Sequence, residues 1–254
     1  MILNKSITTM KHHVVFDVAD LGEDDINNFC VTDYNNGDWE EHTFIIFDKF
    51  KDKNKVMIDM GGWLGITPLY CSENFKHVLA FECDSEALMR FKSNLEVNPL
   101  IKNISICDKA IWNYNGSADF GSKTNGKFGD SESSMLFNSN KNTLQVSTIT
   151  FLTAMNFYKI SLKDIGFIKM DIEGGEKVVI EDMQPFLETY KPTLYLSIHH
   201  HLLSKNDIAN MLDILFDIYS DVKVYNKMGH TFDVDKRRIL DSQLLDCVFT
   251  NKQL

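Results

Sequence analysis

The stretch Val56-Met57-Ile58-Asp59-Met60-Gly61-Gly62-Trp63-Leu64-Gly65 is typical of an apolar strand that ends in an acid and continues into a glycine-rich turn. Gly61, Gly62 and Gly65 have no Cβ, so they permit a tight turn and a close approach of the backbone to a ligand. A second predicted strand ends at Glu82, about twenty residues later, where a carboxylate is well placed to bind ribose hydroxyls. The stretch therefore predicts a strand-turn-helix unit that forms a nucleoside-cofactor pocket.

The acid inside this turn, Asp59, indicates which cofactor would bind. A dinucleotide would place its pyrophosphate at the turn, where the Asp59 carboxylate would repel it. S-adenosylmethionine has no phosphate, and its sulfonium and ammonium groups carry positive charge. The spacing Asp59-x-Gly61-x-x-x-Gly65 therefore favours a methyl donor. The residues alone also allow a simpler reading, in which Asp59 caps the following turn and Glu82 is a solvated strand end.

Short apolar runs alternate with amphipathic helical periods along the chain, as in a mostly parallel sheet with helices on both faces. Strands are predicted near Val56 and at His77 to Glu82, Ile104 to Asp108, Phe167 to Ile172, Thr193 to Ile198, Val222 to Tyr225 and Leu245 to Phe249. Helices are predicted at Trp39 to Phe50, Thr67 to Phe75, Ser85 to Val97, Glu176 to Tyr190 and Asn206 to Tyr219. The sequence therefore predicts an α/β fold.

The length of 254 residues fits one α/β domain with additions. We expect an N-terminal cap or extension over residues 1–41 and a single cofactor-binding domain over residues 42–254. A stretch rich in Ser, Asn and Gly, Asn113 to Asn142, predicts a long functional loop or hairpin. Substrate choice is expected to depend on this loop and on the N-terminal cap.

Charge and cysteine content limit the classes of partner. A net charge of -10 disfavours nucleic acid and anionic membrane surfaces, which reward clustered Lys and Arg. The five cysteines are odd in number and include no C-x-x-C pair, so we expect reduced packing residues. Residues 1–11 contain no long apolar run, and no apolar run in the chain is long enough to span a membrane. These observations predict a cytoplasmic protein with a small-molecule substrate.

Several motifs together resemble the FkbM-type methyltransferase family, which depends on S-adenosylmethionine. They are the pair Trp39-Glu40, the first-strand signature from Ile58 to Gly65, and Glu82 after the second strand. The most specific is Ile168-Lys169-Met170-Asp171-Ile172-Glu173-Gly174-Gly175-Glu176. The resemblance extends roughly from Trp39 to Ile198. It implies a class I methyltransferase fold, a Rossmann-like, seven-stranded and mostly parallel sheet.

The resemblance also implies a set of cofactor-binding residues. Glu82 is expected at the ribose, and Asp108 near the adenine amine. The full predicted set is Glu40, Asp59, Gly61, Gly62, Trp63, Gly65, Glu82, Cys83, Asp108, Lys109 and Asp171. The chain departs from the family at Gly62-Trp63, where a small residue and Asn are usual, and this could reshape the wall beside the methionine moiety. It departs again at His199-His200-His201, where an acid is more frequent.

The predicted catalytic groups follow the fourth and fifth strands of the sheet. Asp171 and Glu173 are expected to share a side, because alternate residues of an extended chain do so. Methyl transfer to a hydroxyl requires removal of its proton, so the candidate bases are Asp171, Glu173, His199 and His200. Asp171 and Glu173 could instead hold Mg²⁺ together with the acceptor oxygen. Lys169 is expected to pair with a nearby acid and to hold the strand end.

The resemblance implies an O-methyltransferase that acts on a hydroxyl of a small molecule, a sugar or glycoconjugate precursor. One alternative is an NAD-dependent dehydrogenase, which also uses a glycine turn and an acid after the second strand. The turn lacks the G-x-G-x-x-G spacing of that class and carries Asp59 where phosphate would approach. Another alternative is a non-catalytic, methyltransferase-like binding module, because a fold does not guarantee an activity.

Overall fold

The structure is a computed structural model of the chain. It describes residues 6–8, 15–17, 39–122, 129, 133–136, 143–226, 228, 230–242 and 246–251. Most of the predicted N-terminal cap, residues 1–41, lies outside the described residues, and so the division at residue 41 stays a prediction. Within it, β1 (Ser6–Thr8) pairs antiparallel with β2 (Val15–Asp17).

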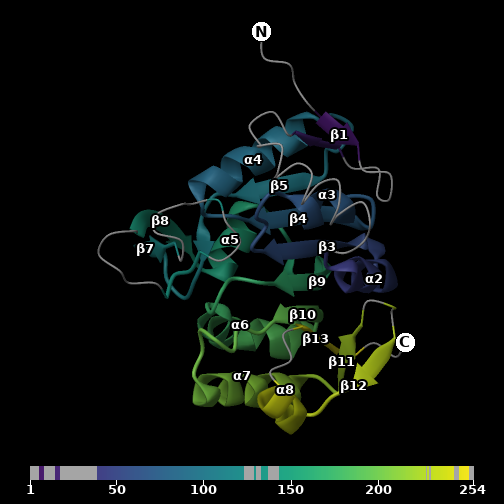
Figure 1. The fold of residues 1–254 in the computed structure, drawn as a ribbon, viewed down its shortest axis with the longest axis vertical. Coiled ribbons are helices and arrows are strands. Elements are labelled where there is room, and N and C mark those ends of the chain that lie inside the picture. Colours follow the sequence, from purple (N-terminus) through teal and green to yellow (C-terminus); the bar gives the residue numbers. More distant parts are fainter. Residues whose placement is uncertain are drawn as a thin grey trace.

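A large sheet forms the centre of the molecule (Figure 1). Its strands are β3 (Asp52–Met60), β4 (Phe75–Phe81), β5 (Ile104–Cys107), β9 (Ile165–Met170), β10 (Thr193–Ser197), β11 (Asp221–Tyr225), β12 (Thr231–Asp233) and β13 (Asp246–Thr250). They lie in the order β12-β11-β13-β10-β9-β3-β4-β5. The five strands from β10 to β5 are parallel, whereas β13, β11 and β12 pair antiparallel. The predicted Rossmann-like, mostly parallel sheet is confirmed, and β12 extends its seven predicted strands at the edge.

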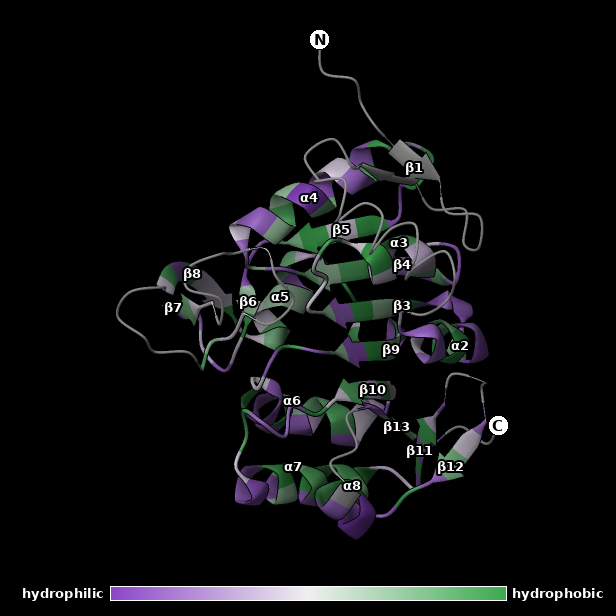
Figure 2. Cartoon of the chain, viewed as in Figure 1, coloured by the Kyte–Doolittle hydropathy of each residue, from purple (hydrophilic) through white to green (hydrophobic). Residues whose placement is uncertain are grey.

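Helices cover both faces of this sheet. One face packs against α2 (Glu41–Phe50) and α3 (Ile66–Cys71), while the other packs against α5 (Phe151–Phe157), α6 (Glu176–Tyr190) and α7 (Lys205–Ile218). In β9, Phe167 packs in the apolar cluster on the side of α2 and α3, and Ile168 packs in the cluster on the side of α5, α6 and α7. Successive strand residues point to opposite faces in this way. Figure 2 shows the hydrophobic strands sandwiched between helices that carry hydrophilic residues as well. The predicted coverage of both faces is confirmed.

The remaining helices are α4 (Ser85–Glu96) and α8 (Lys236–Ser242). The Asp84 side chain caps α4 by accepting the backbone N–H groups of Glu86 and Ala87. No helix in the described part of the chain is both long and apolar enough to cross a membrane.

A small second sheet lies beside the carboxyl ends of the parallel strands (Figure 1). It consists of β6 (Ala110–Ile111), β7 (Gly116–Gly121) and β8 (Thr143–Ile149), in the order β6-β8-β7. Of the predicted loop or hairpin Asn113 to Asn142, β7 lies within the stretch and pairs antiparallel with β8, which begins just after it at Thr143. Residues 123–128, 130–132 and 137–142 lie outside the described residues. The sequence did not predict β6, β8 or α5.

The α3 helix is shorter than predicted, because side chains end it at Cys71. The Ser72 hydroxyl donates to the backbone oxygen of Leu69, 2.6 Å away. The Asn103 amide then donates to the backbone oxygens of Ser72 and Phe75. The bonds to Leu69 and Ser72 satisfy carbonyl groups at the end of the helix, and the bond to Phe75 holds the first residue of β4.

Candidate active site

The glycine turn after β3 brings three strand ends together. Gly61 has a φ of 88°, a conformation that favours glycine. The backbone N–H groups of Gly61 and Gly62 both donate to the oxygen of Phe81, at the end of β4. A Cβ on Gly61 would lie 1.9 Å from the backbone oxygen of Asp171, which follows β9. Gly61 is therefore required for the close approach of β3, β4 and β9.

Gly61→Ala is expected to destabilise the fold and to weaken donor binding. The left-handed conformation alone costs Ala about 1 to 2 kcal/mol, and the clash with Asp171 adds to this. Gly116→Ala is the matched control, because a Cβ on Gly116 meets only ordinary contacts, the nearest at 3.4 Å. Urea unfolding of both variants is the measurement, and equal midpoints would contradict this role for Gly61.

Glu82 follows β4 and accepts two backbone hydrogen bonds. Its Oε2 accepts the N–H of Trp63 and its Oε1 the N–H of Asp84, each at 2.8 Å. Burial raises the pKa of Glu82 to about 7, although these two N–H groups oppose the shift. Because each carboxylate oxygen has a second acceptor site, Glu82 can still bind two hydroxyl groups of a ligand.

A pocket opens where these strand ends meet, with an empty volume of about 1060 Å³ that includes its open mouth. Eight of the predicted cofactor residues line it: Glu40, Gly61, Gly62, Trp63, Glu82, Cys83, Lys109 and Asp171. Asp59, Gly65 and Asp108 are not among the lining residues. Gly65 instead packs against α4, because a Cβ there would lie 2.1 Å from the Phe91 ring. Asp108 is exposed.

Asp59 lies below the pocket and belongs to a buried polar row. It is paired in register with Lys169 of β9, so both side chains point to the face that α2 and α3 cover. Asp59 is 0% exposed and Lys169 4%. Lys169 Nζ lies 3.6 Å from Asp59 Oδ1 and 3.2 Å from Asp171 Oδ2. The predicted pairing of Lys169 with nearby acids is confirmed, whereas the structure gives Asp59 no direct access to the pocket.

The charges in this row control each other's protonation. Burial raises the pKa of Asp59, and Lys169 together with the Thr67 hydroxyl opposes that shift. Burial alone would lower the pKa of Lys169, but Asp171, Asp59 and Glu40 hold it above its ordinary value. Burial also raises the pKa of Glu40 to about 7, with Lys169 as the main opposing charge. Lys169 thus serves as the cation for the buried Asp59 and for two partly exposed carboxylates, those of Glu40 and Asp171.

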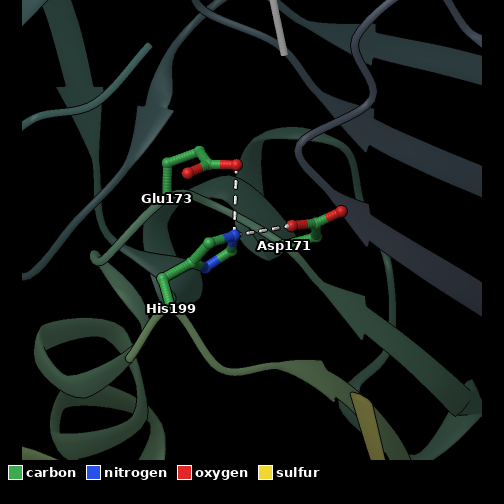
Figure 3. Close-up of side chains that lie close together, drawn as sticks. All are labelled: Asp171, Glu173 and His199. Atoms are coloured by element: carbon green, nitrogen blue, oxygen red, sulfur yellow. Dashed lines mark ion pairs between the residues drawn. The ribbon is translucent and has the colours of Figure 1, made fainter. Parts of the chain in front are cut away.

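A second group of charged side chains gathers around His199, which follows β10 (Figure 3). His199 Nε2 lies 3.1 Å from Glu173 Oε1 and 3.5 Å from Asp171 Oδ1. On its other side, Nδ1 lies 2.7 Å from Oε1 of Glu176, the fully buried first residue of α6. Burial alone would lower the pKa of His199, but its bonds to Glu173 and Glu176 raise it to about 10.

Asp171 and Glu173 were predicted to share a side because alternate residues of an extended strand do so, and this reason is wrong. The predicted strand Phe167 to Ile172 ends at Met170, and the two acids lie in the turn that follows. Glu173 has a φ of 50°, so this turn is not extended and the alternation of a strand does not apply. The turn and His199 bring the two carboxylates together instead. Both acids line the pocket.

The three histidines do not share a site. His199 forms ion pairs with Asp171, Glu173 and Glu176, whereas His201 is exposed and its ring centroid lies 5.9 Å from that of His199. The backbone N–H of His200 donates to Ile198, within a turn, and His200 does not line the pocket. The predicted strand Thr193 to Ile198 ends at Ser197, so all three histidines follow the strand.

Several residues of the site were not predicted. Trp112, Phe120 and Met135 line the pocket from the small sheet and its loops. The Ser134 hydroxyl donates to the backbone oxygen of Glu173, and this ties the small sheet to the acidic turn. These contacts are non-local and leave no spacing signal in the sequence.

A family model described as the methyltransferase FkbM domain matches residues 66–227, more than half of the chain. The chain belongs to the FkbM methyltransferase family. The predicted family is thereby confirmed. S-adenosylmethionine is the methyl donor expected for this family. The match begins just after the Gly61 turn and includes the acidic turn of this FkbM domain. No curated protein matches the chain.

Three of the solved structures that are similar to this FkbM chain illustrate the likeness. An FkbM methyltransferase from Methylobacillus flagellatus KT is 16% identical, with a TM-score of 0.48 over 78% of this chain and 44% of that one. A methyltransferase from Streptococcus mutans, in complex with SAH, is 13% identical, with a TM-score of 0.45 over 82% and 94%. Precorrin-6y C5,15-methyltransferase from Geobacter metallireducens GS-15 is 11% identical, with a TM-score of 0.44 over 84% and 87%. This chain thus spans less than half the length of the first of these proteins.

Proposed function

We propose that this FkbM methyltransferase transfers a methyl group from S-adenosylmethionine to a hydroxyl of a small molecule, a sugar or glycoconjugate precursor. One observation carries the proposal: a single pocket is lined both by Glu82, poised for ribose hydroxyls, and by the carboxylates of Asp171 and Glu173. The first feature suits the donor. The second suits an acceptor that must lose a proton.

The reaction needs the acceptor hydroxyl and the donor methyl group to be held in line. The acceptor oxygen forms a bond to the methyl carbon while the carbon–sulfur bond breaks and its electron pair stays on sulfur. The hydroxyl proton goes to a base. Asp171 and Glu173 are the preferred candidates, because both line the pocket whereas His199 and His200 do not. The same two carboxylates could instead bind a divalent cation such as Mg²⁺.

Aromatic side chains support a carbohydrate acceptor. Trp39, Trp63 and Trp112, the three tryptophans of the chain, all line the pocket. The ring centroids of Trp39 and Trp63 lie 6.5 Å apart. An indole offers a flat apolar face with a polar edge, which suits both the adenine of the donor and the apolar face of a sugar ring. The net charge of -10 supports a small acceptor over nucleic acid or a membrane surface.

We place the reaction in the cytoplasm, and the four described free cysteines, Cys71, Cys83, Cys107 and Cys247, are consistent with a reducing compartment. The direct test is mass spectrometry of a panel of sugars and glycoconjugate precursors incubated with the protein and S-adenosylmethionine. Methylation adds about 14 Da, because a methyl group is gained and a proton is lost. Absence of S-adenosylmethionine and S-adenosylhomocysteine binding in calorimetry would refute the proposal.

Donor binding is expected to strengthen as the pH rises through about 7. Burial, with Asp84 adding to it, keeps the Glu82 carboxyl neutral below that pH in the free protein. Ribose hydroxyls donate hydrogen bonds, so the ligand prefers the ionised form and its affinity falls by up to about tenfold per pH unit below 7. Calorimetry with S-adenosylhomocysteine from pH 6 to 8.5 measures this, and Glu82→Gln should flatten the profile. A profile as steep in Glu82→Gln as in the unmodified protein would exclude Glu82 as the group responsible.

A further inference from the structure

Asp171, Glu173 and His199 each direct a potential ligand atom toward a common point (Figure 3). His199 Nε2 lies 3.1 Å from Glu173 Oε1 and 3.5 Å from Asp171 Oδ1, and the three ligand atoms all lie within 4.8 Å of one another. Two ligands of an ion at about 2.1 Å are about 3.0 Å apart at a right angle and about 3.4 Å apart at the tetrahedral angle. The distances from Nε2 thus match those between neighbouring ligands of a small divalent cation.

A buried carboxylate fixes the orientation of the His199 ring from behind. Glu176 is 0% exposed, and its Oε1 lies 2.7 Å from His199 Nδ1 and 3.2 Å from the backbone N of Gly174. Its Oε2 has no hydrogen-bond partner among the described residues. When Nδ1–H donates to Glu176, the second ring proton is on Nε2, and a cation that displaces this proton meets the Nε2 lone pair between Asp171 and Glu173. Metal-binding histidines commonly have such a carboxylate partner on the second nitrogen.

The charges around the site also favour a cation. Five carboxylates lie around Lys169 and His199: those of Glu40, Asp59, Asp171, Glu173 and Glu176. Lys169 pairs with Asp59 and Asp171, and the only ion pair of Glu173 within the described part of the chain is with His199. Acidic side chains are therefore in excess beside the pocket, and a divalent cation would offset this charge.

We propose that Asp171, Glu173 and His199 bind a divalent cation of the Mg²⁺ or Mn²⁺ type, with Glu176 as the positioning residue. The inference rests on the methyl transfer proposed above and names what activates the acceptor. Three protein ligands leave positions open for water and for the acceptor hydroxyl, whose pKa a bound cation lowers. The hydroxyl proton then passes to water, the oxygen bonds to the methyl carbon, and sulfur keeps the electron pair of the broken bond.

The test is calorimetric titration of the chelator-treated full chain with Mn²⁺ alone, in the absence of donor and acceptor. Mn²⁺ also gives an electron paramagnetic resonance signal that separates free from bound ion. We expect saturable binding of about one Mn²⁺ per chain, weakened at least about tenfold in Glu173→Gln, His199→Gln and Glu176→Gln. Glu176→Gln removes no ligand, so weaker binding in this variant tests the positioning role.

His201→Gln is the matched control, because this exposed histidine neighbours His199 without facing the two acids, and it should bind Mn²⁺ as the unmodified protein does. Each variant is also titrated with S-adenosylhomocysteine, which reports a folded donor pocket. No saturable Mn²⁺ binding, or equal affinity in the Glu173→Gln and His199→Gln variants, would overturn the cation site. Donor binding that persists in that case would leave the proposed methyl transfer standing, whereas loss of donor binding in the unmodified protein would refute the transfer itself.

Discussion

Asp171→Asn is expected to lower the rate of methyl transfer by at least about 100-fold while S-adenosylhomocysteine still binds. The substitution keeps the size of the side chain but removes the negative charge that lines the pocket beside Glu173. Loss of that charge removes a ligand of the proposed cation or, in a reaction without the cation, a base for the acceptor hydroxyl. The glycine turn and Glu82 stay in place, so the donor keeps those contacts.

The measurement is single-turnover methyl transfer with the acceptor found by mass spectrometry, together with calorimetry for the donor. Asp217→Asn is the matched control, because Asp217 is exposed on α7 and should tolerate the same change at no cost in rate. A rate within about twofold of the unmodified protein would show that Asp171 is not part of the reaction, since loss of a general base costs about 100-fold or more.

Lys169→Met is expected to lower the free energy of unfolding by about 3 to 5 kcal/mol, the usual cost of removing one partner from a buried ion pair. Asp59 is 0% exposed and pairs with Lys169 across adjacent strands, so the variant leaves a carboxylate buried without its cation. Adding Asp59→Asn should recover part of the loss, because the amide carries no charge.

Urea unfolding of the single and double variants gives these free energies. Lys177→Met is the control, since Lys177 forms ion pairs with Glu181 and Asp207 on partly exposed side chains and should cost less than about 1 kcal/mol. A loss in Lys169→Met as small as in this control, or no recovery on adding Asp59→Asn, would contradict a stabilising ion pair in the buried row.

The donor half of the site was largely predictable because its residues are close in the sequence. Gly61, Gly62, Trp63 and Glu82 follow the ends of two adjacent parallel strands, and such strand ends meet at one edge of the sheet. The predicted pairing of Lys169 with a nearby acid also holds, since Lys169 lies within β9 and pairs with Asp59 and Asp171. Asp59 shows the limit of the same reasoning: its position in the turn motif was clear, but full burial under the pocket depends on packing against α3.

The residues of the acidic half of the site were predicted, but their geometry was not. Asp171 and Glu173 come together through a turn in which Glu173 adopts a positive φ, a conformation that strand periodicity does not describe. Glu176 was known only as the last residue of a motif, yet it holds His199 from 23 positions away. Nothing in the spacing of His199, His200 and His201 indicated which of them would face the acids.

The sequence by itself determined the fold, the family and the residues that line the pocket at the ends of β3 and β4, because hydrophobic period, glycine positions and strand-end acids are local patterns. Only the tertiary structure decided which charged groups meet. His199, Glu173 and Glu176 lie on the ends of different elements, and their distances depend on how β9, α6 and β10 pack together. Packing likewise placed all three tryptophans around one pocket. The charged cluster around His199 is therefore a product of long-range contacts, which no local sequence pattern specifies.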